Sequence, residues 1–189
     1  MKGPLFYSKI LLFGEYGIIE DSKGLSIPYN FYKGALKIPN KINSISKSSN
    51  DILKDFLNFL KSRKINLDLV KFAYDLDKGL YFDSSIPKGY GIGSSGALVA
   101  AVYDKYAFEK ITVLENLTQE KLLKLKEIFS NMESFFHGKS SGLDPLNSYL
   151  SIPILINSKR DIKVTGIPSQ KSNGNGAVFL MDSGKIGST

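Results

Sequence analysis

A glycine-rich stretch at residues 86–97, IPKGYGIGSSGA, has the composition of a loop that wraps an anion. Its glycines, at positions 89, 91, 93 and 96, can adopt positive φ and let the backbone approach a ligand closely. If Ser94 or Ser95 begins a helix, the free amide N–H groups of its first turn form a phosphate site. We therefore predict a phosphate-binding loop, while a tight strand-to-helix turn with glycines needed only for packing would have the same composition.

Two familiar nucleotide motifs fit this stretch less well. A P-loop ends in Gly-Lys-Ser or Gly-Lys-Thr, whereas Gly-Ser-Ser stands here at residues 93–95. A dinucleotide fold has its first glycine directly after a strand and an acidic residue about 20 positions later, at the end of a second strand. Here Pro87 intervenes and Glu115 follows a predicted helix, so an NAD-binding fold is the weaker alternative.

A second stretch, MESFFHGKSSGLDP at residues 132–145, places a carboxylate on the apolar face of a predicted helix. At about 100° per residue, Glu133 falls within about 40° of Leu122 and Phe129, and Glu127 lies on the opposite side. A buried carboxylate is costly unless it is paired or binds a metal ion. We therefore expect Glu133 to point into the protein; the alternative is a helix-edge glutamate that reaches solvent.

The loop after this helix can return Asp144 toward the helix, and Pro145 then fixes the direction of the chain. Asp144 alone could cap a turn, and His137 alone could be a hydrogen-bonded helix end. Phosphoryl transfer would require these groups to converge on the glycine loop. Ser95 and Glu133 could then bind Mg²⁺, Asp144 could take up the proton of an acceptor hydroxyl, and Lys9 could offset the transferred charge.

The elements that must position these residues alternate between strands and helices, which predicts an α+β domain. Residues 5–19 indicate an opening β-meander, with another strand at residues 34–38 after a connection that contains glycine and proline. Helices are predicted over residues 48–64, 94–108 and 118–136. Further strands are predicted at residues 80–84, 149–157, 161–167 and 177–182.

Composition excludes several other classes of function. The chain has 189 residues, no cysteine and one histidine, so disulfides, thiolate sites and histidine clusters are ruled out. Its net charge of +7 comes mainly from scattered lysines, which favours a solvated surface over nucleic-acid binding. No export signal or membrane-length apolar run is visible, so we expect a cytoplasmic protein that binds neither membrane nor nucleic acid; a homodimer remains open.

Three motifs in order resemble the GHMP kinases, and within them the mevalonate kinase branch. They are SKILLFGEYGII, PKGYGIGSSGAL and ESFFHGKSSGLDP, the last with the same eleven-residue step from glutamate to aspartate. Three positions depart from the family pattern: Gly96 stands where alanine is usual, Ser140 where many members have proline, and Ile92 where leucine is usual.

The resemblance implies ATP and Mg²⁺ as cofactors and a role for each matched position. Ser95 and Glu133 would bind the metal, and Asp144 and Lys9 would be catalytic. Glu15, His137, Gly138 and Ser141 would lie near the substrate. The triphosphate would be held by Pro87, Gly89, Gly91, Gly93, Ser94, Ser95, Gly96 and Ala97.

The resemblance also implies a fold and a reaction. Residues 1–189 would form the N-terminal ATP-binding domain, a β-α sandwich that ends where a ferredoxin-like C-terminal domain begins. The implied reaction is phosphorylation of the hydroxyl of a small molecule, mevalonate first. Alternatives are another GHMP-type substrate (phosphomevalonate, a sugar such as galactose, or homoserine), a nucleotide-binding fragment without activity, and an NAD-dependent oxidoreductase.

Overall fold

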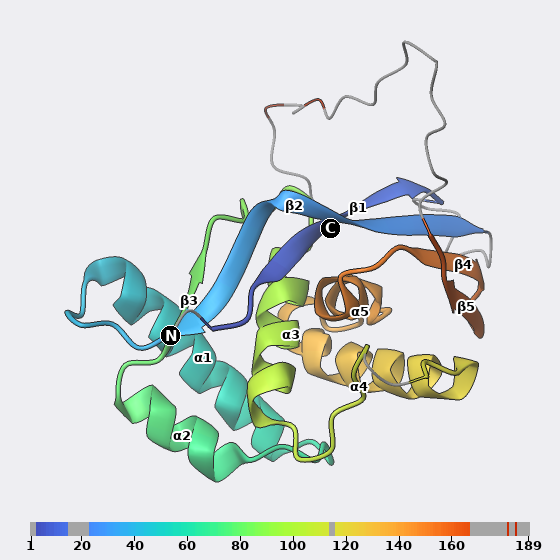
Figure 1. Cartoon of the computed structure of the whole chain (residues 1–189). Helices are drawn as coiled ribbons and strands as arrows, with labels where there is room; N and C mark the ends of the chain where they lie inside the picture. Colours follow the sequence, from blue (N-terminus) through green and yellow to red (C-terminus); the bar gives the residue numbers. More distant parts are fainter. Residues whose placement is uncertain (1–2, 15–22, 114–115, 167–180, 182–183, 185–189) are drawn as a thin grey trace.

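The computed structural model describes residues 3–14, 23–113, 116–166, 181 and 184. These residues form a five-stranded antiparallel sheet with five helices packed beneath it in the view of Figure 1. This is the α+β class that the alternation of strands and helices predicts. No helix in the described part of the chain is long and apolar enough to cross a membrane.

The sheet is organised around one long strand, β2 (Gly24–Lys37). Along one edge β2 pairs with β1 (Phe6–Phe13). Its other edge is shared by β3 (Tyr81–Ser84) and β4 (Ile154–Ser158), and β4 then pairs with β5 (Asp161–Val164).

The prediction of a connection before residue 34 is wrong, because β2 already begins at Gly24 and runs through Pro28. The register explains the misleading signal. Tyr7 pairs with Lys33 but Ser8 pairs with Tyr29, so three extra residues of β2 bulge out between two paired segments. Gly24 and Pro28, which suggested the connection, are both paired within this strand, and the irregularity lies at residues 30–32.

The first helix, α1 (Ser44–Lys61), begins earlier than the sequence predicts. Asn43 is its N-cap: the Asn43 side chain accepts a hydrogen bond from the Ser46 amide, and the Ser46 hydroxyl accepts one from the Asn43 amide. Leu53, Phe56 and Leu60 of α1 are buried, as their helical spacing predicts.

The next two helices differ in how well the sequence predicts them. α2 (Leu69–Asp77) was not predicted; Asp68 caps it, and it buries only Phe72, Asp75 and Leu76. α3 (Ser94–Tyr106) matches its prediction and is nearly enclosed, because its small side chains let neighbouring elements approach on several sides.

The last two helices carry the acidic stretch. α4 (Gln119–His137) begins after Thr118 as predicted, and it buries Leu122, Leu125, Phe129 and Met132. α5 (Leu143–Leu150) replaces the loop and the strand start predicted there, so the expected strand at residues 149–157 is limited to β4. Ser151, with φ of 51°, ends α5 in the left-handed conformation. The strand predicted at residues 177–182 lies largely outside the described residues.

Candidate active site

The glycine loop is attached to the middle of β1. The Lys9 amide of β1 donates a hydrogen bond to the carbonyl of Ile92 at 3.0 Å. Gly89, Gly91 and Gly93 have φ values of 80°, 67° and 82°, a region that favours glycine. A Cβ on Gly93 would also lie 3.0 Å from Lys9 Cγ, so the loop and the lysine side chain are in close contact.

The loop leads directly into α3, with Gly93 as its N-cap. No side chain in the described part of the chain caps this end, and Ser94 and Ser95 occupy the first helical positions. The first amides of α3 therefore have no intrahelical acceptor and can bind an anion. The Ala97 amide already donates to the Gly93 carbonyl and the Ala97 methyl group is fully buried, so Ala97 contributes packing.

Gly96 sets the distance between α3 and α5. A Cβ at this position would lie 2.7 Å from the carbonyl carbon of Asp144 and 2.8 Å from the nitrogen of Pro145. The two helices therefore touch backbone to backbone at this point, which brings Asp144 to the start of α3. Asp144 Oδ1 lies 3.0 Å from Lys9 Nζ, in an ion pair whose lysine side chain is 10% exposed.

Glu133 of α4 is buried, as its place on the apolar face predicts, with 3% of its surface exposed. Its two carboxylate oxygens accept hydrogen bonds from different elements: Oε1 from the Ser95 hydroxyl at 3.0 Å, and Oε2 from the Ser140 hydroxyl. Burial, together with repulsion from Asp144, raises the pKa of Glu133 from 4.5 to about 7, against the opposing effect of both serines and Lys9.

His137 completes this cluster from the C-terminal end of α4. Its Nε2 lies 3.0 Å from the Ser95 hydroxyl oxygen. When Glu133 is ionised it can only accept the single hydrogen of that hydroxyl, and the imidazole then donates from Nε2. Ser95 is thus held by a helix start, a carboxylate and an imidazole.

The remaining predicted residues lie around this centre or outside it. Pro87 is partly buried at the loop entrance. Gly138 ends α4 with φ of 70° and is exposed. Ser141 is exposed and accepts a hydrogen bond from the Leu143 amide. Glu15 lies outside the described residues, so its predicted place near the substrate stays a prediction.

A hollow of about 780 Å³ opens beside the start of α3. Ser94, Ser95 and His137 line it, and so does Lys88 of the glycine loop. Its apolar lining comes from α1, β3 and its following loop, α3, and the end of α4: Ile45, Ile52, Phe82, Ile86, Leu98, Phe135 and Phe136.

Sequence reasoning missed these apolar lining residues because they continue the spacing of core-facing positions. Phe135 and Phe136 form an aromatic cluster with Phe56 of α1. Ile45, at the start of α1, is 75% exposed in the structure, but the sequence alone does not show this exposure and an isolated exposed apolar residue is common on protein surfaces.

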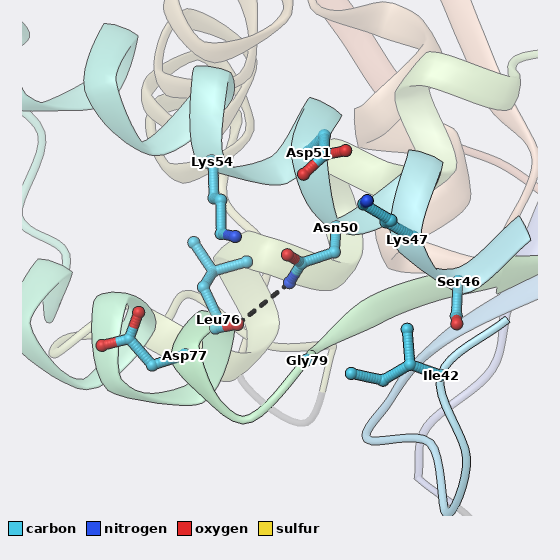
Figure 2. A pocket seen from close by; sticks show the side chains of 9 residues that line it. All are labelled: Ile42, Ser46, Lys47, Asn50, Asp51, Lys54, Leu76, Asp77 and Gly79. Carbon is cyan, nitrogen blue, oxygen red and sulfur yellow. Dashed lines mark hydrogen bonds between the residues drawn. The ribbon is translucent and has the colours of Figure 1, made fainter. Parts of the chain in front are cut away.

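A second hollow, of about 350 Å³, lies between α1 and the end of α2 (Figure 2). The Asn50 side chain in this hollow already has protein partners, because its amide donates hydrogen bonds to the carbonyls of Leu76 and Leu80. Figure 2 shows Asn50 pointing from α1 toward Leu76, with Lys54 and Asp77 nearby. This hollow therefore has the features of a helix-joining contact, and the candidate chemistry lies elsewhere.

The donor atoms beside the glycine loop suit Mg²⁺. Among the described residues there is no group of three or more histidine, aspartate or glutamate side chains that could hold a metal ion. Mg²⁺ does not need one, since it binds one or two protein oxygens and takes phosphate oxygens and waters for the rest. Glu133 Oε1 and Ser95 Oγ are such oxygens, and no described lysine or arginine is ion-paired with the buried Glu133 carboxylate.

The fold and the site define an α+β domain in which a glycine loop meets a buried carboxylate and a paired aspartate. The family model for the GHMP kinases N terminal domain matches residues 52–151, just over half of the 189 residues. The chain belongs to this family. No curated protein sequence matches the chain.

Several solved mevalonate kinases are similar to this chain. The L. major enzyme, solved in complex with R-mevalonate, is 17% identical with a TM-score of 0.47, over 82% of this chain and 48% of that one. The Staphylococcus aureus MRSA252 enzyme is 21% identical with a TM-score of 0.47, over 85% and 53%. For the Methanococcus jannaschii enzyme the values are 17%, 0.48, 88% and 56%. The chain thus spans about half the length of these proteins.

Proposed function

We propose that this chain is the nucleotide-binding part of a kinase that transfers phosphate from ATP, with Mg²⁺, to the hydroxyl group of a small molecule. One observation carries the proposal. The ion pair of Lys9 and Asp144, 3.0 Å apart, lies at the start of α3, where Ser95 is also 3.0 Å from the buried Glu133. Three distant parts of the sequence, at Lys9, residues 86–97 and residues 133–144, would thus supply a cation, a phosphate loop, a metal ligand pair and a base to one place.

The hollow of about 780 Å³ is the proposed nucleotide site. Its volume falls in the range of about 300–1,000 Å³ that is usual for small-molecule pockets. Its apolar lining suits an adenine ring, and Ser94 and Ser95 at the start of α3 also line it. A nucleotide with its base among the apolar residues would extend its phosphates toward the start of α3.

The triphosphate is assigned to the glycine loop and the first turn of α3. The loop backbone, with Pro87 at its entrance and Gly89, Gly91 and Gly93 in positive φ, can approach the phosphates without side-chain interference. Ser95 and Glu133 would hold Mg²⁺, which when bound neutralises charge on the phosphate oxygens.

Asp144 is the proposed general base. As the acceptor oxygen forms its bond to the γ-phosphorus, the bond from that phosphorus to ADP breaks and the hydroxyl proton passes to the Asp144 carboxylate. Lys9 fixes the orientation of Asp144 through the ion pair and places a positive charge beside the transferred phosphoryl group.

Mevalonate is the proposed acceptor, and the support for it is the motif resemblance of residues 133–144. His137, Gly138 and Ser141 lie at or after the end of α4, within the same segment as Asp144, and are assigned to the acceptor side together with Glu15. Phosphomevalonate, a sugar such as galactose, and homoserine are the alternatives that a test must include.

The test is ADP release from Mg·ATP with mevalonate, phosphomevalonate, homoserine or galactose as acceptor. Asp144→Asn should lower kcat by about 10²- to 10⁴-fold, the usual contribution of a general base, and leave the affinity for a non-hydrolysable ATP analogue nearly unchanged. Asp51→Asn, an exposed carboxylate of α1, is the matched control. If the gene encodes a longer chain, both forms are assayed.

The outcomes separate the parts of the proposal. Activity with one acceptor that is lost in Asp144→Asn supports both the kinase and the base. Equal activity in Asp144→Asn would reject the base. Preferential binding of NAD over ATP by the unaltered chain would reject the kinase.

A further inference from the structure

We infer that Ser140 is a positioning residue that holds Glu133 in its metal-binding orientation. The inference rests on the proposed function, because it concerns the pair of Glu133 and Ser95. Ser140 itself lies in the loop between α4 and α5, and no step of the proposed mechanism uses it.

The hydrogen-bond direction at Ser140 is fixed by its partners. The Ser140 hydroxyl oxygen accepts a hydrogen bond from the Gly142 amide at 3.0 Å. An amide N–H can only donate and an ionised carboxylate can only accept, so the single hydroxyl hydrogen of Ser140 points to Glu133 Oε2. A hydrogen bond to an ionised acceptor is stronger than one between neutral groups.

The two carboxylate oxygens of Glu133 have different partners. Oε2 is occupied by Ser140, and Oε1 faces the Ser95 hydroxyl. A cation bound between Oε1 and Ser95 Oγ would compete with the Ser95 hydrogen bond but would leave the Ser140 contact intact. Ser140 therefore holds the carboxylate plane both before and after the metal binds.

The loop around Ser140 is itself held in place. The Ser130 hydroxyl of α4 donates a hydrogen bond to the Ser140 carbonyl. Gly142 has φ of 73°, and a Cβ there would lie 2.7 Å from the Ser130 amide nitrogen. Because the loop cannot shift easily, the Ser140 hydroxyl is a fixed point for Glu133, as outer-shell partners of metal ligands usually are.

The experiment measures metal binding without turnover. Isothermal titration calorimetry gives the Kd of AMP-PNP, a non-hydrolysable ATP analogue, once with Mg²⁺ and once with EDTA. In the unaltered protein the ratio of the two constants reports how much Mg²⁺ strengthens binding. Ser140→Ala should reduce this ratio by about 10- to 100-fold, the usual effect of removing an outer-shell partner, and leave the affinity in EDTA unchanged.

Two variants separate the hydroxyl contact from a general effect on the loop. Ser140→Thr keeps a hydroxyl group and should preserve the ratio. Ser130→Ala removes the hydrogen bond to the Ser140 carbonyl but leaves the Ser140 hydroxyl, and should therefore reduce the ratio less than Ser140→Ala does. If Ser140→Ala does not fold, Ser140→Cys, with a weaker donor of similar shape, provides the same comparison.

An unchanged ratio in Ser140→Ala, or an equal loss in Ser130→Ala, would overturn the inference. Glu133→Gln distinguishes this failure from failure of the proposed function. If Mg²⁺ strengthens binding in the unaltered protein and Glu133→Gln abolishes that effect, the metal pair stands whatever Ser140 does. If Mg²⁺ has no effect that depends on Glu133, the metal pair is wrong and the role of Ser140 falls with it.

Discussion

Replacing Glu133 with glutamine should change how the stability of the metal-free protein depends on pH. The pKa of Glu133 is raised from 4.5 to about 7, chiefly by burial and then by Asp144. A carboxyl group with a raised pKa in the folded state favours folding while it is protonated, and this contribution disappears as pH rises through the folded value. The unaltered protein should therefore lose stability between about pH 4.5 and pH 7.

The size of this loss follows from the two pKa values. At about 1.4 kcal/mol for each pH unit, the rise from 4.5 to about 7 corresponds to about 3 kcal/mol of unfolding free energy. Glutamine does not ionise, so Glu133→Gln should lack this loss. The glutamine NH₂ group cannot accept the hydrogen bond that one carboxylate oxygen accepts now, but this loss is the same at every pH and leaves the predicted pH dependence unchanged.

Urea denaturation in EDTA at pH 5 and pH 8 is the assay. The unfolding free energy of the unaltered protein should decrease from pH 5 to pH 8. In Glu133→Gln this decrease should be smaller, by up to about 3 kcal/mol. Glu127→Gln, at an exposed position on the same helix, is the matched control and should follow the unaltered protein.

Equal pH dependence in Glu133→Gln and in the unaltered protein would refute the claim that Glu133 is buried with a raised pKa. The same carboxylate predicts that a proton competes with Mg²⁺. The concentration of Mg²⁺ needed for half-maximal stabilisation should therefore rise as pH falls below about 7, and this dependence should be absent in Glu133→Gln.

Two further substitutions test the packing that places the site. Gly96→Ala should destabilise the protein by about 1–3 kcal/mol and lower kcat more than it alters nucleotide affinity, because its Cβ would lie 2.7 Å from the Asp144 carbonyl carbon and push α5 away. Denaturation measures the first effect and steady-state kinetics the second. Kinetics equal to those of the unaltered protein would contradict the close contact. Asn50→Ala should cost about 2–4 kcal/mol, since the carbonyls of both Leu76 and Leu80 lose their donor; a change below about 1 kcal/mol in thermal or urea unfolding would show that water replaces the amide.

The sequence predicts the helices best where one strong periodic signal covers the whole element. α3 and α4 are examples, with α4 beginning after Thr118 and burying Leu122, Leu125, Phe129 and Met132 at helical spacing. α5 escaped prediction because it has only eight residues, begins with Leu-Asp-Pro and has no side-chain cap in the described structure. β2 was divided because Gly24 and Pro28 resemble a connection, whereas the strand contains both and absorbs its irregularity as a bulge.

The burial of Glu133 is the site property that the sequence predicts from physical reasoning alone. Helical periodicity placed the carboxylate on an apolar face, and the structure confirms its burial. The contact of Gly96 with Asp144 was not predictable in this way, because it depends on the crossing of two helices far apart in the sequence. The contact of Ser140 with Glu133 also depends on how the chain folds, so from the sequence Ser140 is only a departure from the family pattern.

The electrostatics of the cluster explain why these contacts belong together. Asp144 and Glu133 repel one another, and the charge of Lys9 acts on Glu133 although, among the described residues, Lys9 is ion-paired only with Asp144. With Glu133 ionised, the cluster therefore carries two negative charges against one positive charge. A divalent cation beside Glu133 would remove this imbalance and lower the cost of burying the carboxylate. The contacts at Gly96 and Ser140 keep the two carboxylates close together, so the repulsion between them is not relieved by a movement of either group. The unfolding free energy of the metal-free protein is therefore lower than its packing alone would give, and binding of the cation should raise it.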